Sequence, residues 1–223
     1  MSIDSAIFLF TFLPLLLILE AVIRPIRAKN VFLCLAGLVF YAFGALAALI
    51  ASALVNWALG LWAMRGAKMA VACAAVLNLA LLGACKYLGF FGEGLALIGV
   101  PLNLPAIAAP AGVSFFTFKG ISYVVDAYRR PEDGSKNFFR VLFYISFLPE
   151  IMSGPLSRFE NFEEQLVSRD RGIERTAHGL RRFILGLAKK LLLSGGCAIL
   201  VDAAFSAGEA LDARMAWLGA ISY

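Results

Sequence analysis

The chain has 223 residues, of which 61% are hydrophobic and only 16% charged, whereas soluble domains have about 45–50% and about 25% on a similar count. A chain this apolar cannot cover its surface with polar groups in water. These values therefore exclude an ordinary cytosolic enzyme, a disordered protein and a secreted disulfide scaffold. The net charge of +5 indicates Lys and Arg held on one side of a membrane rather than nucleic-acid binding.

Apolar runs long enough to cross a bilayer dominate the first half of the chain. The first run reads as an uncleaved helix, because no Lys or Arg precedes it and no small-residue cleavage site follows it. Residues 31–64 are too long for one helix, and Gly44 near their middle predicts a hairpin of two spans. The predicted spans here are Ser5–Ile23, 31–46, 48–64 and Met69–Phe91.

The second half is less regular. Gly92–Gly112 is rich in Gly and Pro, which predicts a loop or an interfacial segment. Gly112–Tyr128 is a further span, and the apolar run Phe138–Met152 is short for a crossing. Thr176–Phe205 predicts a long helix that starts amphipathic, and Ala213–Tyr223 begins another apolar segment.

Basic residues gather in three connectors. Residues 24–30, 65–68 and 129–140 hold three, two and four Lys or Arg, whereas 92–112 hold none. The positive-inside rule then places these connectors in the cytoplasm and the N-terminus outside. If residues 138–152 enter the membrane and return, the basic residues that follow also stay inside. The connectors 129–137 and 156–178 are therefore predicted to be cytoplasmic, within a single membrane domain over residues 1–223.

The cysteines lie in apolar runs without a CxxC pair, and only one histidine is present. We interpret them as small buried hydrophobic residues and expect neither a disulfide nor a metal site. The four are Cys34, Cys73, Cys85 and Cys197.

Three segments together resemble one protein family. They are VSFFTFKGISYVVDAYR at 113–129, FYISFLPEIMSGPLSRF at 143–159 and GLRRFILGLAKKLLL at 179–193. In order and spacing they resemble the membrane-bound O-acyltransferase family, in the bacterial polysaccharide branch typified by alginate O-acetylation. The resemblance covers nearly the whole chain and is tightest from residue 113 to 205.

The resemblance implies an all-α polytopic membrane protein with about six to seven transmembrane or re-entrant helices, forming part of a ring around a central funnel. It implies transfer of an acyl group, often acetyl, from an acyl-CoA or another acyl thioester, with no bound cofactor. The implied acceptor is an exported polysaccharide or a lipid-linked acceptor, reached with a periplasmic acyltransferase partner. The implied location is the bacterial inner membrane, with membrane lipid as a partner and no nucleic acid.

The essential histidine of that family lies in a later part of the chain, so this sequence resembles the N-terminal half. His178, in RTAHGLRR at the head of a basic amphipathic helix, does not match that position. We therefore assign no catalytic residue in this chain. The basic stretch 169–190 is expected to attract anionic lipid headgroups or a polyanionic donor.

Candidate funnel residues are polar groups at membrane depth, where charge is costly and marks function. Lys119 needs a partner, and Glu150 either lines the funnel or pairs with Arg158 or Lys119. Asp126 lies at the end of its span and can pair with Arg129 or Arg130. The full set is Lys119, Ser122, Tyr123, Asp126, Glu150, Ser153, Gly154, Pro155 and Arg158.

Other interpretations of these residues remain open. Ser153-Gly154-Pro155 predicts either a bend that lines a pore with free backbone amides or an ordinary turn. Arg158 holds a phosphate or carboxylate of the donor, or it is an interfacial cation. For the whole chain, a transporter-like protein and a non-catalytic membrane scaffold are the alternatives. A transporter should show a repeat between its halves, and we find none.

Overall fold

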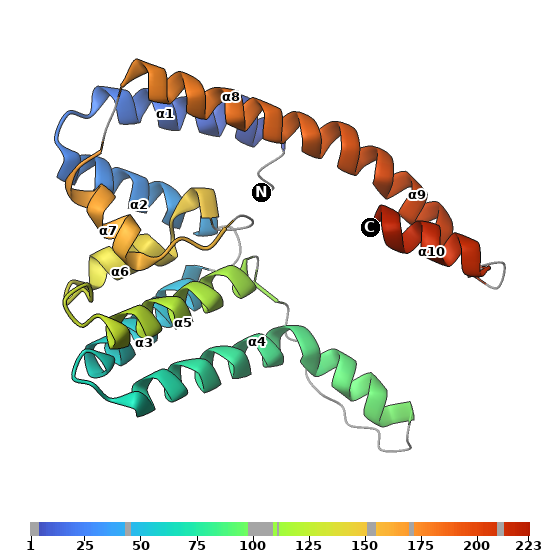
Figure 1. The fold of residues 1–223 in the computed structure, drawn as a ribbon, viewed down its shortest axis with the longest axis horizontal. Helices are drawn as coiled ribbons and strands as arrows, with labels where there is room; N and C mark the ends of the chain where they lie inside the picture. Colours follow the sequence, from blue (N-terminus) through green and yellow to red (C-terminus); the bar gives the residue numbers. More distant parts are fainter. Residues whose placement is uncertain are drawn as a thin grey trace. The chain divides into compact units, whose positions relative to one another are not determined.

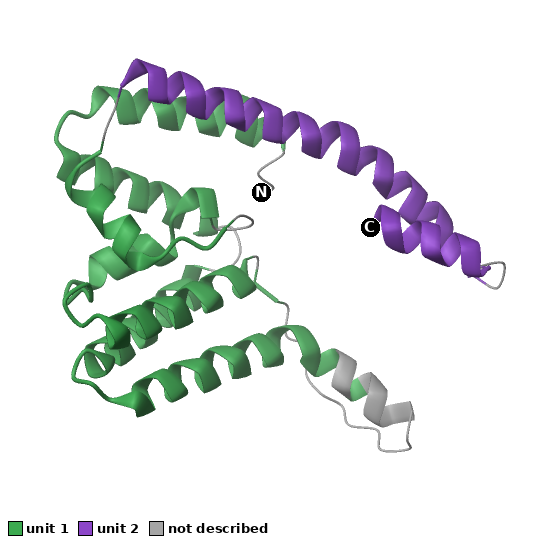
Figure 2. Cartoon of the chain, in the orientation of Figure 1, with its two compact units in different colours: residues 1–169 green, residues 170–223 purple. Residues whose placement is uncertain are grey.

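The computed structural model describes residues 5–42, 46–97, 109–110, 112–150, 155–169, 172–208 and 212–223. Within these ranges every regular element is a helix and no strand occurs, which confirms the all-α fold class. The chain, drawn as a ribbon in Figure 1, forms two compact units, residues 1–169 and 170–223, which Figure 2 colours separately. The single membrane domain over residues 1–223 stays a prediction.

The first unit contains the helices that carry the candidate site. A π-helical stretch, Phe8–Phe12, leads into the first helix, so the first predicted apolar run is helical. The two helices predicted between residues 31 and 64 and the helix predicted after residue 112 are also confirmed, while Gly44 at the predicted turn lies outside the described residues. That the helices beginning at Leu13, Ile26 and Val113 cross a membrane stays a prediction. The helices of this unit are α1 (Leu13–Val22), α2 (Ile26–Ala42), α3 (Leu46–Ala63), α4 (Lys68–Leu97), α5 (Val113–Arg129), α6 (Phe138–Ile145) and α7 (Phe159–Val167).

Two predicted connectors are shorter than expected. Helix α2 begins directly after Pro25, so most of the connector 24–30 is helical. This is possible because the buried Lys29 ammonium lies 2.8 Å from the Glu20 carboxylate at the end of α1. Helix α4 continues to Leu97, past the predicted end at Phe91, because a glycine costs a helix only about 1 kcal/mol. The rest of the predicted loop, from 98 to 108, lies outside the described residues.

The predicted re-entrant run forms only short elements. Helix α6 has eight residues, roughly 12 Å at 1.5 Å per residue, which cannot cross a core of about 30 Å. After a break at Ser146 and Phe147, a 3-10 turn covers Leu148–Glu150. The residues from Val141 to Ser146 are all buried. Elements this short agree with a run that does not cross the membrane. Its re-entry into the membrane stays a prediction.

The second unit contains one long helix and a shorter one. Helix α8 (Ile173–Lys189) continues through a π-helical turn, Lys190–Ser194, into α9 (Gly195–Phe205), which confirms the long helix predicted there. Helix α10 (Ala213–Ser222) packs on α9 at Gly219, where an added Cβ would lie 2.9 Å from the Ala204 Cβ.

Several helices have the character of membrane spans. By length and composition, three helical stretches of the described residues are long and apolar enough to cross a membrane: Leu46–Ala63, Lys68–Gly89 and Ile173–Phe205. The shorter stretch Phe8–Val22 is also apolar. The chain is an all-α membrane protein, and closure of its helices into a ring stays a prediction.

Helices α3, α4 and α5 pack around a pair of buried amides. Asn56 Nδ2 donates to Asn78 Oδ1 at 3.2 Å, and Asn78 Nδ2 donates back to Asn56 Oδ1 at 2.8 Å. Gly120 of α5 lies against the same amide, since an added Cβ would be 2.3 Å from Asn56 Nδ2. The reciprocal bonds fix the register of α3 on α4, and the glycine lets α5 approach both.

This amide pair yields a testable coupling. In a double-mutant cycle of Asn56→Ala and Asn78→Ala, we expect a coupling of about 0.6–1.7 kcal/mol, the range for interhelical hydrogen bonds in membrane proteins. The cycle is measured by denaturant unfolding of the purified native protein in detergent. Additive single effects would show that the two amides do not interact.

Candidate functional site

The buried Lys119 ammonium lies at the centre of four connected residues, Lys119, Tyr144, Glu150 and Ser157, which we call the Lys119 cluster. The Lys119 side chain is only 1% exposed. Its Nζ lies 2.7 Å from Glu150 Oε2 and donates to the Tyr144 carbonyl at 2.7 Å. Of the two partners predicted for Glu150, the structure therefore contains Lys119.

Local folding explains this position. Lys119 is on the buried face of α5 together with Phe116 and Tyr123. The Tyr144 carbonyl belongs to the last turn of α6, where carbonyls have no partner within the helix and the helix dipole is negative. The ammonium therefore satisfies a helix end and a carboxylate together, which lowers the cost of burying its charge.

Two further bonds close the cluster. Ser157 Oγ donates to Glu150 Oε2 at 2.9 Å, and the Tyr144 phenol donates to the Ser157 carbonyl at 2.7 Å. The ammonium also lies 4.7 Å from the centre of the Tyr144 ring, a cation–π distance. Residues on both sides of 151–154 are thus attached to α5 and α6.

Three candidates, Ser153, Gly154 and Pro155, lie between Glu150 and Ser157 in the sequence. Ser153 and Gly154 lie outside the described residues, and Pro155 is exposed. The Lys119 cluster joins Glu150 and Ser157, which precede and follow the Ser-Gly-Pro sequence.

The phenol of Tyr144 should contribute to stability. We expect Tyr144→Phe to lower the unfolding free energy by about 1 kcal/mol, because it removes one buried hydrogen bond and leaves the Ser157 carbonyl without this donor. Tyr128→Phe is the matched control, since the Tyr128 phenol has no hydrogen bond to the described residues. Equal thermal stability of the two variants in detergent would contradict the assignment.

The other candidates on α5 point to different places. The Ser122 hydroxyl interacts with the Tyr144 phenol, beside the cluster. The Tyr123 phenol instead donates to the Ser135 carbonyl at 3.0 Å, and its ring packs edge-on against Phe159 at 4.9 Å. Tyr123 therefore holds the connector after α5, a role that its position in the sequence did not indicate.

Asp126 and Arg158 lie in a second group. They line a small pocket of about 100 Å³ with Arg129, Arg130, Asp133 and Glu160. Arg130 is paired, 2.6 Å from Glu160 and 3.7 Å from Asp133. Neither pairing considered for Asp126 is present among the described residues, where its buried Oδ2 has no hydrogen-bond partner. Arg158 is exposed at this pocket and does not pair with Glu150.

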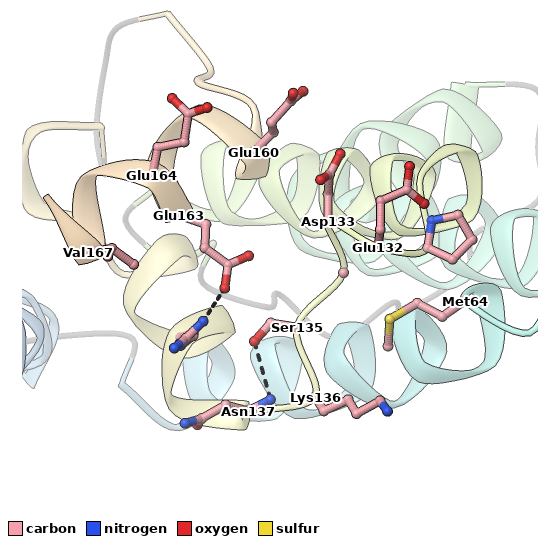
Figure 3. Close-up of a pocket in the computed structure, with 13 residues that line it drawn as sticks. Met64, Glu132, Asp133, Ser135, Lys136, Asn137, Glu160, Glu163, Glu164 and Val167 are labelled. Carbon is pink, nitrogen blue, oxygen red and sulfur yellow. Dashed lines mark hydrogen bonds and ion pairs between the residues drawn. The ribbon is translucent and has the colours of Figure 1, made fainter.

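An acidic cavity of about 800 Å³, which was not predicted from the sequence, lies between the connector 131–137 and α7 (Figure 3). Glu160, Glu163 and Glu164 project from α7, and Glu163 pairs with Arg140. Their spacing of three and four residues places them on one helix face, a signal that the sequence did contain. The cavity is lined by more carboxylates than cations. In the described part of the chain, no group of His, Cys, Asp and Glu could hold a metal ion.

Comparison with known proteins finds relatives that align with the full length of this chain. No protein-family model and no solved structure matches it. The chain is 31% identical to the probable alginate O-acetylase of Azotobacter vinelandii, over all of this chain and 47% of that protein. It is 32% identical to the probable alginate O-acetylase of Pseudomonas aeruginosa, over all of this chain and 45% of that protein. It is 26% identical to the peptidoglycan O-acetyltransferase of Helicobacter pylori, over 99% of this chain and 49% of that protein.

The chain thus spans about half the length of the curated relatives that it matches. Those relatives are named for the O-acetylation of alginate and of peptidoglycan. Their similarity confirms, over the full chain, the resemblance to the bacterial polysaccharide branch of the membrane-bound O-acyltransferase family.

Proposed function

We propose that the chain is a portion of a membrane O-acyltransferase that transfers acyl groups, chiefly acetyl, to an exported polysaccharide or another cell-envelope acceptor. The observation that carries this proposal is the similarity along the whole chain to O-acetyltransferases of about 30% identity. We propose that the base that removes the proton of the acceptor hydroxyl lies in the half of the relatives that this chain does not span, since His178 does not match the position of the family's essential histidine.

Within this proposal, the Lys119 cluster is a positioning device. It holds the backbone on both sides of Ser153 and Gly154 while its own charges neutralise one another. Because this sequence is held on both sides, we propose that its backbone N–H groups stabilise the oxyanion that forms as the hydroxyl attacks the thioester. Lys119 and Glu150 act through that segment rather than on the reacting atoms.

The donor is an acyl-CoA or another acyl thioester, and the pocket of Asp126 and Arg158 receives its anionic part. Arg129 and Arg158 line this pocket, and neither forms an ion pair with the described residues. A guanidinium binds phosphate through two parallel hydrogen bonds.

The proposal includes a location in the bacterial inner membrane with the N-terminus outside. The Lys and Arg residues gathered in the connectors 24–30, 65–68 and 129–140 support this topology. A periplasmic acyltransferase partner completes the transfer to the acceptor. Membrane lipid surrounds the helices, and the basic stretch 169–190 supports contact with anionic headgroups.

The decisive experiment is deletion of the native gene, followed by measurement of acetyl groups on the exported polysaccharide and on peptidoglycan. We expect one polymer to lose its acetyl groups and to regain them when the native protein is restored. Restoration with Arg158→Gln should leave acetylation about tenfold lower at limiting donor, whereas Arg65→Gln, on another exposed connector, should restore it fully. Unchanged acetyl content after deletion would support a scaffold instead.

A further inference from the structure

A second cavity of the first unit has no part in the proposed acyl transfer. It encloses about 790 Å³ between α2, α6 and α7. Its apolar wall comes from all three helices, and its polar groups come from α2 and from the start of α6. The lining residues include Arg27, Asn30, Leu35, Leu38, Phe139 and Arg140.

The cavity is an open trench that follows α2. Its lining residues on that helix recur every three to four positions from Ile26 to Leu38, which forms one stripe. At 1.5 Å per residue this stripe is roughly 18 Å long. Leu35 and Phe139 are 54% and 71% exposed, so the trench is open along its length. In a bilayer, an open apolar trench is filled by a lipid acyl chain or by another apolar segment.

The polar groups of the trench gather at one end. Asn30 Nδ2 donates to the Leu166 carbonyl at the end of α7 at 2.9 Å. Arg140 pairs with Glu163 of the same helix, so it lies at the α7 end as well. At the opposite end, Ser146 lies against Gly37 and Cys34.

The charge at this end is positive. Arg27 is exposed and forms no ion pair with the described residues, and Arg169 donates to Asn30 Oδ1. One carboxylate, Glu163, faces these guanidinium groups. Arg27 and Arg140 belong to connectors that the positive-inside rule assigns to the cytoplasmic face, where the bilayer surface carries anionic lipid.

We propose that this trench binds an anionic phospholipid of the cytoplasmic leaflet. One acyl chain lies along the apolar stripe of α2, and the phosphate lies between Arg27 and Arg140. The layout of the trench matches the ligand, because its apolar length ends in a cationic rim. This binding is independent of the proposed acyl transfer and of the pocket of Arg158.

The test uses the native protein in vesicles of phosphatidylcholine that contain a small fraction of phosphatidylglycerol with a photoreactive acyl chain. We expect the label on peptides that cover residues 31–38 and 139–143, and we expect unlabelled phosphatidylglycerol to compete for it better than phosphatidylcholine. Arg27→Gln should reduce labelling about fivefold, the ratio for one cation near an anionic surface, while Arg65→Gln should leave it unchanged.

A second pair of variants tests the trench itself. Leu35→Trp fills the apolar stripe and should abolish the label and the phosphatidylglycerol retained in native mass spectrometry. Leu77→Trp adds the same ring at an exposed site of α4 and should retain both. Equal labelling by the two lipids, equal loss in both tryptophan variants, or crosslinks from 31–38 to another protein segment would each overturn the proposal. Acetylation of polysaccharide, measured on the same variants, reports separately on the proposed function.

Discussion

Replacing Lys119 with methionine in the native protein should lower the free energy of unfolding by about 3–5 kcal/mol and abolish acetyl transfer. The substitution leaves the Glu150 carboxylate, whose side chain is 17% exposed, without its cation. It also removes the donor to the Tyr144 carbonyl at the end of α6. Removing one partner of a buried pair is costly because the remaining charge stays in a region of low polarity.

The measurement is denaturant unfolding of the purified protein in detergent, compared with a second ion pair. Arg130→Met breaks the exposed pair with Glu160, whose side chains are 53% and 36% exposed, and should cost less than about 1 kcal/mol. The double variant Lys119→Met with Glu150→Gln should recover most of the stability, because no charge is then left unpaired. It should not recover acetyl transfer if the cluster positions the Ser-Gly-Pro segment.

Equal losses in Lys119→Met and Arg130→Met would contradict the buried pair. A double variant that is less stable than the single one would contradict the coupling between Lys119 and Glu150. Loss of stability without loss of acetyl transfer would leave the pair in place and refute its positioning role.

The sequence predicted the helices because hydropathy and charge act locally along the chain. The two helices between residues 31 and 64 followed from an apolar run too long for one helix, and the long helix that begins near residue 176 followed from an amphipathic start and an apolar end. The start of α2 could not be predicted, because it depends on Glu20 meeting Lys29 across a turn. The end of α4 depends on the small cost of its glycines, which no connector pattern reveals.

The candidate site was predicted in part for similar reasons. A lysine and a glutamate within apolar runs demand partners, so Lys119 and Glu150 could be named from the sequence. Tyr144 and Ser157 could not, because their roles use backbone carbonyls whose positions follow from the fold. Pairing of Asp126 with Arg129 or Arg130 was one interpretation of the sequence. In the structure Arg130 pairs with Glu160 and Asp133, and Arg129 lines the small pocket beside Asp126.

Close packing between helices could not be predicted from the sequence either. It is the basis of a second large expected loss of stability. Gly37 of α2 lies against the backbone after α6, where an added Cβ would be 2.3 Å from the Ser146 carbonyl oxygen. The obstacle is a backbone atom, so no side-chain rotation can relieve the contact. Gly37→Ala should therefore separate α2 from the bend that leads to Glu150 and cost about 1–3 kcal/mol, as overpacking does.

Gly83 provides the matched control, because it also lies inside a helix but has nothing within 4 Å of an added Cβ. Gly83→Ala should be neutral or stabilising by up to about 1 kcal/mol, since alanine favours the helix more than glycine does. Both variants are compared by denaturant unfolding in detergent, with acetyl transfer as the second readout. If Gly37→Ala and Gly83→Ala have the same free energy of unfolding, α2 does not contact the backbone at Ser146. If Gly37→Ala loses stability and acetyl transfer together, the contact between α2 and Ser146 supports the same segment that the Lys119 cluster holds from the other side.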